Sequence, residues 1–241
     1  MKKGIYILPN ALTLAGMLAG FYAILAAIKG NFIDASWAVL AAMIFDGLDG
    51  FAARLTGSAS RFGIELDSLS DLVAFGVAPA LIIYLASLNT FGRVGGLVAF
   101  LYVACGAMRL ARYNVQMVTA ERKYFTGVPI PGAAVVISTL IIFSWKTGTD
   151  IGHSVLVLLL TFVLSLLMVS TLRFHGMKDI NFSRRKPFWI LVALVFVFVI
   201  VAMHPEVSLF FVAMAYLLAG LIENAIILYL RKRKTYQKEN I

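Results

Sequence analysis

IYILPNALTLAGMLAGFYAILAAI, residues 5–28, is an almost uninterrupted apolar run near the start of the chain. A helix needs about 20 mostly apolar residues to cross the hydrocarbon core of a bilayer, and this run is longer than that. The preceding MKK, residues 1–3, could pass for the charged beginning of a secretory signal peptide. Because the run is long enough to span and nothing soluble follows that would need export, we expect it to be a retained transmembrane helix.

The whole chain has the same character. Of its 241 residues, 61% are hydrophobic and 14% are charged, and the mean hydropathy is +0.91. A soluble domain carries roughly a quarter charged residues, so most of this chain is expected to be solvated by lipid. The net charge of +9 fits cationic loops against anionic headgroups, and without a basic stripe on a polar domain we expect no nucleic-acid partner. The only cysteine, Cys105, excludes an intrachain disulfide.

Eight runs of this kind follow one another and predict an all-α, polytopic helix bundle. No linker separates them, so residues 1–241 are expected to form a single transmembrane domain, with residues 187–230 as a C-terminal helix pair. The predicted helices span residues 5–28, 32–55, 62–88, 95–118, 129–145, 151–172, 187–203 and 207–230.

The distribution of basic residues predicts the topology. An even number of helices puts both termini on one side of the membrane. Of the 21 lysines and arginines, 18 then lie on the side of the termini, and only Lys29, Arg93 and Lys146 lie on the other. Because cytoplasmic loops carry the excess of basic residues, we expect both termini in the cytoplasm and a multi-pass protein of the cell membrane.

Four aspartates stand where a membrane helix should avoid them. Asp46 and Asp49 lie near the end of the second predicted helix, and Asp67 and Asp71 near the start of the third. Each carboxylate costs about 2.5–3.5 kcal/mol within a spanning helix unless it is paired or hydrated. Their i,i+3 and i,i+4 spacings put each pair on one helix face, and the short connection makes the two helices antiparallel neighbours. We therefore expect a single pocket that binds Mg²⁺ or Mn²⁺, with room for two ions that bridge a phosphate.

Two other interpretations of the aspartates are weaker. Arg54 and Arg61 could pair with them, but two arginines neutralise four carboxylates poorly. A cation transporter could use them, but carriers bind their ion near the bilayer midplane, whereas these residues cluster at the cytoplasmic end. Helix packing alone would account for Gly50 and Gly63 but not for the aspartates, and a transporter has no use for these glycines.

The segment DGLDGFAAR, residues 46–54, begins a pattern that continues through Gly63 to Asp67 and Asp71. It fills every fixed position of D-x2-D-G-x2-A-R-x8-G-x3-D-x3-D, and residues 46–71 therefore resemble the signature of the CDP-alcohol phosphatidyltransferases. The resemblance implies an enzyme in which an alcohol hydroxyl attacks the lipid-linked phosphate of a CDP-lipid and releases CMP.

The resemblance also implies a role for each signature residue. The four aspartates would hold the divalent ions, and Asp71 would accept the proton of the attacking hydroxyl. The PNALT segment, residues 9–13, lies near where the nucleotide binds in this family. The residues expected at the CDP-lipid are Asn10, Thr13, Asp49, Gly50, Ala53, Arg54 and Gly63.

Two further stretches, RLARYN at 109–114 and FTGVPIP at 125–131, are typical of the phosphatidylserine synthase branch. They imply CDP-diacylglycerol and L-serine as substrates and a homodimer. An arginine suits the carboxylate of serine, but it would equally suit glycerol 3-phosphate or inositol phosphate, so those acceptors stay open. The expected acceptor residues are Arg109, Arg112, Asn114, Thr126, Gly127 and Pro129.

Overall fold

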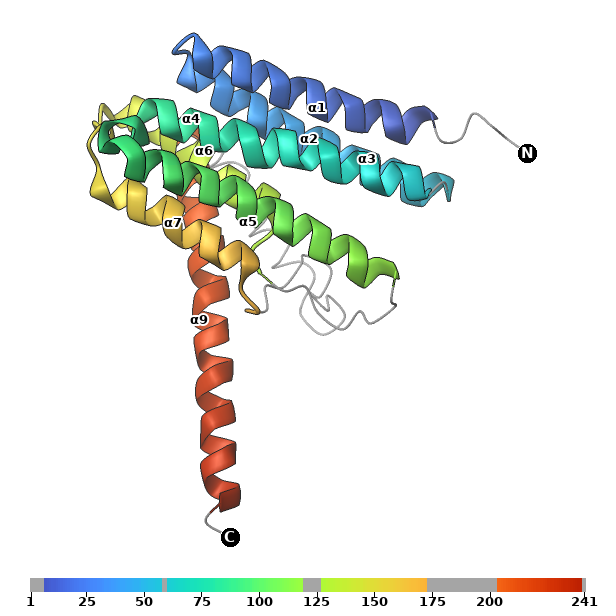
Figure 1. Ribbon diagram of the computed structural model, residues 1–241, viewed down its shortest axis with the longest axis vertical. Coiled ribbons are helices and arrows are strands. Elements are labelled where there is room, and N and C mark those ends of the chain that lie inside the picture. Colours follow the sequence, from blue (N-terminus) through green and yellow to red (C-terminus); the bar gives the residue numbers. More distant parts are fainter. Residues whose placement is uncertain (1–6, 58–59, 119–126, 173–202, 240–241) are drawn as a thin grey trace.

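The computed structural model describes residues 7–57, 60–118, 127–172 and 203–239, and within these ranges the chain is helical apart from short connections (Figure 1). The predicted all-α class is confirmed. The elements are α1 (Ile7–Ile28), α2 (Phe32–Thr56), α3 (Arg61–Asp71), the π-helical η1 (Leu72–Val77), α4 (Ala78–Ala86), the 3-10 helix η2 (Leu88–Phe91), α5 (Gly92–Val118), α6 (Ile130–Thr147), α7 (Val155–Val169) and α9 (Pro205–Glu239).

Several of these helices can cross a membrane, which makes the chain a multi-pass membrane protein. α2 is long enough, at 25 residues, but it carries four charged side chains, and α7 is short, at 15 residues. The predicted helix at 187–203 lies almost wholly outside the described residues, so the number eight stays a prediction. In the described part of the chain, five stretches are both long and apolar enough to span: Ile7–Ile28, Arg61–Ala86, Leu88–Gln116, Ile130–Thr147 and Pro205–Asn224.

The predicted third helix, 62–88, is in fact a continuous run of α3, η1 and α4 with a π-helical segment in its middle. A π-helix widens the backbone and leaves carbonyl groups out of the regular α pattern. The buried Tyr102 hydroxyl of α5 donates a hydrogen bond of 3.2 Å to one of them, the Phe75 carbonyl. Asp71, the last residue of α3, therefore stands where the helix changes its winding.

α1 lies along α2 and also packs on α3, η1 and α4 (Figure 1). Small residues allow the close approach. A Cβ on Gly20 would lie only 2.5 Å from the Ala74 Cα of η1, so no larger residue fits there without movement. Nearer the start of α1, the Ser70 hydroxyl donates a hydrogen bond of 3.0 Å to the Thr13 carbonyl. α1 is thus fixed against the segment that carries Asp67 and Asp71.

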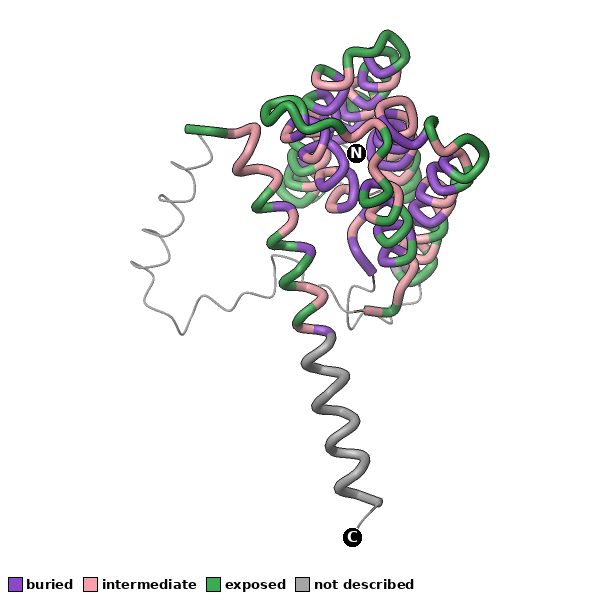
Figure 2. Tube along the Cα trace, turned by 90° about the vertical axis from the view of Figure 1, so that its left-hand side faces the viewer, coloured by how far each residue is buried: buried purple, intermediate pink, exposed green. Residues whose placement is uncertain are grey.

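Most residues of α6 are buried, and its contacts extend to α2, α4, α7 and α9. Figure 2 shows buried residues throughout the bundle, while α9 carries fewer of them along its described part. The first turns of α9 pack on the end of α6. There Phe143 of α6 and Phe210 of α9 stack with ring centroids 4.8 Å apart, and Lys146 pairs with Glu206 at 3.8 Å. From there α9 extends away from the other helices (Figure 1). It runs to Glu239, beyond the predicted end at residue 230.

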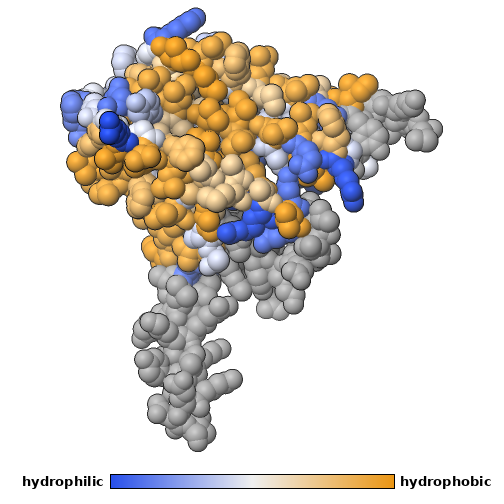
Figure 3. All heavy atoms as spheres, viewed as in Figure 1, coloured by the Kyte–Doolittle hydropathy of each residue, from blue (hydrophilic) through white to orange (hydrophobic). Residues whose placement is uncertain are grey.

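The outside of the bundle is apolar. Figure 3 shows hydrophobic residues across the middle of the visible face and hydrophilic ones mainly toward the helix ends. Large side chains such as Leu18 and Phe100 are more than two-thirds exposed. A surface of this extent is unusual on a soluble monomer and matches contact with lipid.

Candidate metal and CDP-lipid site

The aspartates that the sequence singles out do come together. One carboxylate oxygen each from Asp46, Asp49 and Asp67 lie within 4.8 Å of one another. Asp71 follows one helical turn after Asp67, and its charge interacts with those of the other three and with the Arg109 guanidinium. Asp49 is buried and the other three are half-buried. Four carboxylates from two helices therefore face one small volume.

Local sequence explains how the two helices reverse between these pairs. α2 ends at Gly57, whose left-handed backbone (φ +60°) lets its N–H return to the Ala53 and Arg54 carbonyls. α3 begins at Ser60, whose hydroxyl accepts a hydrogen bond of 2.9 Å from the Gly63 N–H. Both ends are thus capped, and α3 starts with its Asp67 face directed toward α2.

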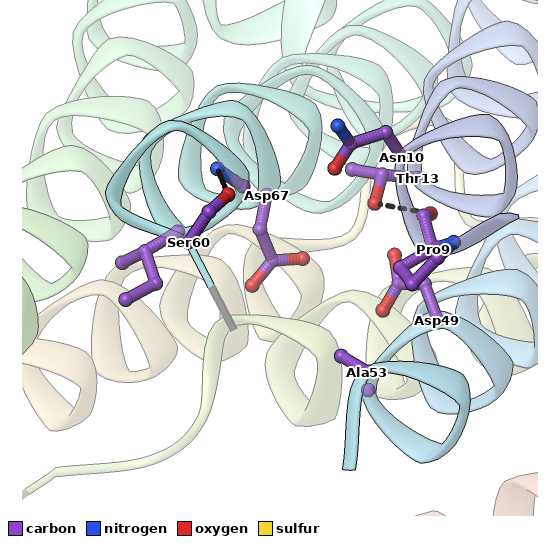
Figure 4. Close-up of a pocket in the computed structure, with 10 residues that line it drawn as sticks. Pro9, Asn10, Thr13, Asp49, Ala53, Ser60 and Asp67 are labelled. Atoms are coloured by element: carbon purple, nitrogen blue, oxygen red, sulfur yellow. Dashed lines mark hydrogen bonds between the residues drawn. The ribbon is translucent and has the colours of Figure 1, made fainter. Parts of the chain in front are cut away.

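A pocket of about 110 Å³ opens beside the carboxylates, between α1, α2 and α3. Figure 4 shows Asp49 and Asp67 pointing into it from opposite walls, with the Thr13 hydroxyl beside Asp49. The pocket is lined by Pro9, Asn10, Thr13, Asp49, Gly50, Ala53, Ser60, Gly63, Ile64 and Asp67. Six of the seven residues expected at the CDP-lipid are therefore on its wall.

Gly63 keeps the pocket open. A Cβ at this position would lie 3.2 Å from the Ser60 hydroxyl and 3.4 Å from the Asn10 side-chain oxygen, so it would fill the space between them. Glycine allows a ligand to approach the backbone here. The Asn10 and Ser60 oxygens remain on either side of that space as polar groups.

Arg54 is the seventh expected residue, and it does not line the pocket. Its side chain is exposed, and its Nη1 would lie 3.4 Å from a Cβ on Gly50. Because Gly50 is part of the pocket wall, the guanidinium is next to the pocket mouth. A long arginine side chain can reach an anionic ligand from such a position.

Ser60 and Ile64 line the pocket but were not predicted as site residues. Ser60 does carry a signal in the sequence: it is a serine just two residues before the start of the predicted helix 62–88, close to the usual place of an N-cap. Ile64 has no such signal, because its apolar side chain resembles any other membrane-facing residue.

Two of the three expected acceptor residues on α5, Arg112 and Asn114, have hydrogen-bond partners in other helices or at their ends. Arg112 donates a hydrogen bond of 3.0 Å from Nη1 to the Val169 carbonyl at the end of α7. Asn114 donates to the Ser68 hydroxyl at 3.0 Å and to the Glu65 carboxylate at 3.3 Å, which joins α5 to α3. Arg109 differs from both, because its Nε is buried without a hydrogen-bond partner among the described residues.

The connection before α6, which carries Gly127 and Pro129, is hydrogen-bonded to the end of α7 through Gly127 and Val128. The Gly127 N–H donates to the Leu172 carbonyl at 2.8 Å, and φ is +82°. A Cβ there would lie 2.3 Å from the Met168 carbonyl oxygen. Glycine is therefore required for two reasons: the left-handed backbone and the lack of space for a side chain. Pro129 is the N-cap of α6. Thr126 lies outside the described residues.

The carboxylate cluster fits a hard divalent cation. Metal–oxygen distances of about 2.1 Å put opposite ligands about 4.2 Å apart, close to the observed spread of 4.8 Å. Among the described residues no ion pair neutralises Asp46, Asp49, Asp67 or Asp71. Buried or half-buried carboxylates without such a partner need another cation.

Fold and site together define a class: a helical membrane protein whose carboxylates can hold a divalent cation beside a pocket for a polar ligand. The family model of CDP-alcohol phosphatidyltransferase matches residues 6–167, more than half of the chain. That match includes all four aspartates and every residue of the pocket. The chain belongs to the CDP-alcohol phosphatidyltransferase family.

Several relatives have names that specify their acceptor. The CDP-diacylglycerol–serine O-phosphatidyltransferase of Helicobacter pylori is 41% identical over 197 residues, which cover 81% of this chain and 83% of the relative. The archaetidylserine synthase of Methanothermobacter thermautotrophicus is 37% identical over 178 residues, or 73% of this chain and 72% of the relative. A CDP-diacylglycerol–serine O-phosphatidyltransferase of Methanocaldococcus jannaschii is 35% identical over 173 residues, or 71% and 75%.

Proposed function

We propose that this protein transfers the phosphatidyl group of CDP-diacylglycerol to the hydroxyl of L-serine, releasing CMP and forming phosphatidylserine. The observation that carries the proposal is the cluster of Asp46, Asp49 and Asp67 carboxylates, with Asp71 one turn further along, beside a pocket that Asp49 and Asp67 line. The serine acceptor is supported by the relatives named above, which span both bacteria and archaea.

Asp46, Asp49, Asp67 and Asp71 are the residues that would hold the metal, Mg²⁺ or Mn²⁺, with two ions at full occupancy. Bound divalent cations would offset the negative charge of the diphosphate. The aspartates, two from each helix, would fix the position of the cations relative to the pocket. Because η1 follows directly after Asp71, the fourth carboxylate is held by a helix segment with its own packing against α1 and α5.

The cytidine diphosphate part of the lipid substrate would occupy the pocket between α1, α2 and α3. Asn10 and Thr13 supply polar groups from α1, while Gly50, Ala53 and Gly63 leave room for the ligand. Asp49 serves both the ligand wall and the metal cluster. Arg54, next to the mouth, is placed to contact a phosphate or the nucleotide.

In the transfer step the serine side-chain oxygen attacks the phosphorus that carries the diacylglycerol. A bond forms between that oxygen and phosphorus, the bond from phosphorus to the CMP oxygen breaks, and CMP leaves with the electron pair. We assign Asp71 as the base that accepts the hydroxyl proton, because a serine hydroxyl is a weak nucleophile at neutral pH. Its place one turn after Asp67, beside the metal-binding carboxylates, supports this assignment.

The acceptor would lie toward α5 and the start of α6. Arg109 is the strongest candidate for its carboxylate, because its charge interacts with Asp71 and its buried Nε lacks a partner in the described chain. Arg112 uses one N–H group to bond the Val169 carbonyl. Because a guanidinium carries five N–H groups, others are left that could bind the acceptor. Asn114, Thr126, Gly127 and Pro129 complete the proposed acceptor region.

We place the protein in the cell membrane with the site and both termini on the cytoplasmic side. The support is the segregation of lysines and arginines along the sequence. We also propose a homodimer, as the family resemblance suggests.

The test is CMP release from CDP-diacylglycerol by the purified protein, with Mg²⁺ or Mn²⁺ present. L-serine, glycerol 3-phosphate and inositol phosphate are added separately. We expect release that depends on L-serine. Release only with a phosphorylated alcohol would overturn the acceptor but keep the metal site, and absence of release with any acceptor would overturn the transferase assignment.

A further inference from the structure

α9 brings a side chain to the acceptor region from outside the part of the chain that the family model matches. That match ends at residue 167, and α9 begins at Pro205. α9 packs on α6, and its Ala213 and Leu217 are almost completely buried there, at 7% and 4% exposure. Tyr216, between them in sequence, keeps 39% of its surface exposed. The helix is therefore anchored on α6 while this tyrosine stays partly exposed.

The Tyr216 ring lies at the beginning of α6. A Cβ on Gly132, in the first turn of α6, would lie 3.6 Å from Cε1 of Tyr216, which is ordinary van der Waals contact. The first turn of α6 follows the Gly127–Pro129 connection already assigned to the acceptor region. Tyr216, from α9, therefore contacts the same end of α6 that follows this connection.

Arg109 approaches that helix end from α5. Gly106, one turn earlier on α5, is in close contact with α6, since a Cβ there would lie 2.6 Å from Cδ1 of Ile130. Asp71, Tyr113 and Tyr216 interact electrostatically with the Arg109 guanidinium. Together with the contacts of Gly106 and Gly132, this indicates that Arg109 and Tyr216 approach the same end of α6 from two different helices.

Two sets of donors at this end of α6 lack a side-chain acceptor. The Arg109 Nε is buried and has no acceptor among the described residues. Burying a donor without an acceptor costs free energy, because its hydrogen bond to water is lost and not replaced. The N-cap of α6 is Pro129, which offers no side-chain acceptor to the first turn, and a helix N-terminus favours negative charge. A carboxylate would satisfy both.

We propose that Tyr216 is a specificity-determining residue: its hydroxyl and the Arg109 guanidinium together hold the carboxylate of the amino-acid acceptor. This inference rests on the proposed function and adds a binding residue to it. The guanidinium donates to the carboxylate, and the phenol donates a second hydrogen bond to it. With its carboxylate fixed there, the acceptor directs its hydroxyl toward Asp71.

Tyrosines also occur at membrane interfaces as anchors, and that role needs mainly the amphipathic ring. Tyr216→Phe separates the two roles, because it keeps the ring against Gly132 and removes only the hydroxyl. Tyr22→Phe is the matched control. Tyr22 is an exposed tyrosine of α1, and it lies away from the pocket residues.

The experiment measures serine-dependent CMP release by the wild type and both variants, with KM determined separately for L-serine and CDP-diacylglycerol. We expect Tyr216→Phe to raise the KM for L-serine about tenfold or more, the loss of one hydrogen bond to a charged group, with the KM for CDP-diacylglycerol unchanged. Tyr22→Phe should match the wild type in both.

An unchanged KM for L-serine in Tyr216→Phe, or an equal rise in both KM values, would overturn this inference while leaving the proposed function intact. Failure of the wild type to release CMP in response to L-serine would overturn the proposed function, and the inference with it. Thermal unfolding of the variants in detergent checks that the fold is unchanged. We expect no change, because Tyr216→Phe removes only one hydroxyl from a partly exposed ring.

Discussion

The four aspartates are the part of the site that the sequence predicts best. Their spacing within α2 and α3 determines which helix face they share, and their cost in an apolar helix demands a compensating cation. Contacts across the bundle are different. Arg112 donates to Val169, 57 positions away, and Gly127 packs against Met168, so neither partner can be read from local pattern. Such contacts depend on how helices associate, which periodicity does not specify.

Asp71→Asn tests the assignment of the base. The change removes the proton acceptor and keeps the size of the side chain, so we expect kcat to fall by about 100-fold or more. CDP-diacylglycerol binding should be partly retained, because Asp46, Asp49 and Asp67 remain. CMP release and direct CDP-lipid binding are the two measurements.

Asp34→Asn is the control for this variant. Asp34 is exposed in the first turn of α2, at the other end of the helix from the cluster, and should tolerate the change with activity intact. Turnover by Asp71→Asn near the wild-type rate would show that the base lies elsewhere.

Asp67→Asn tests the metal site. Loss of one of the clustered carboxylates should weaken metal binding. If the lost ligand contributes about as much as a hydrogen bond to a charged group, the Mg²⁺ concentration for half-maximal activity should rise about tenfold or more. A chelator should abolish wild-type activity, and added Mg²⁺ or Mn²⁺ should restore it. Activity that survives complete metal removal would contradict the assignment.

At the scale of elements, the apolar runs predict the helices well. The predicted fourth helix, 95–118, corresponds to α5, and the predicted fifth, 129–145, to α6. The π-helical η1 was not predicted, because LVAFGV at 72–77 continues directly into the apolar residues of α4 and nothing in it marks a change of winding. Its position is explained by tertiary contacts, the Tyr102 hydrogen bond and the close approach of Gly20.

Gly20→Ala tests the close packing of α1 on η1. The new methyl group would lie 2.5 Å from the Ala74 Cα, so the helices must separate, and overpacking of this kind costs about 1–3 kcal/mol. We expect a lower midpoint of thermal unfolding in detergent. Gly96→Ala is the matched control, since the nearest atom to its Cβ is a Tyr84 carbon at 3.9 Å. Equal midpoints for both variants would argue against close α1–η1 packing.

Arg112→Ala asks whether an arginine that contacts α7 also serves the acceptor. We expect a lower unfolding midpoint, because the Val169 carbonyl loses its donor, and a KM for L-serine that rises more than that for CDP-diacylglycerol. Steady-state kinetics with each substrate varied in turn provide the measurement. Equal changes in the two KM values would limit Arg112 to the nucleotide site or to structure.

At the scale of the whole molecule, the sequence predicts an apolar bundle with basic residues on one side, and the structure supplies its arrangement. The position of α9 could not be predicted, because its apolar composition shows that it can span but not which helix it contacts. Its contact with α6 through Phe210 and Glu206 emerges only in three dimensions.

Labelling with a membrane-impermeant thiol reagent tests the topology. A cysteine at Arg93, an exposed residue of the sparsely charged side, should react in intact cells. A cysteine at Lys238, in the basic C-terminal segment, should react only after permeabilisation. The native Cys105 is buried and should add little background. The reverse pattern would invert the orientation, and reaction of both in intact cells would contradict a single cytoplasmic side for the basic residues.

The most direct test of the central claim uses L-serine labelled with ¹⁸O in its side-chain hydroxyl, incubated with the purified protein, CDP-diacylglycerol and Mg²⁺. If the serine hydroxyl attacks the lipid-linked phosphorus, the label appears in the phosphatidylserine product and is absent from the released CMP. Label in CMP, or CMP release without labelled phosphatidylserine, would contradict transfer of the phosphatidyl group to serine.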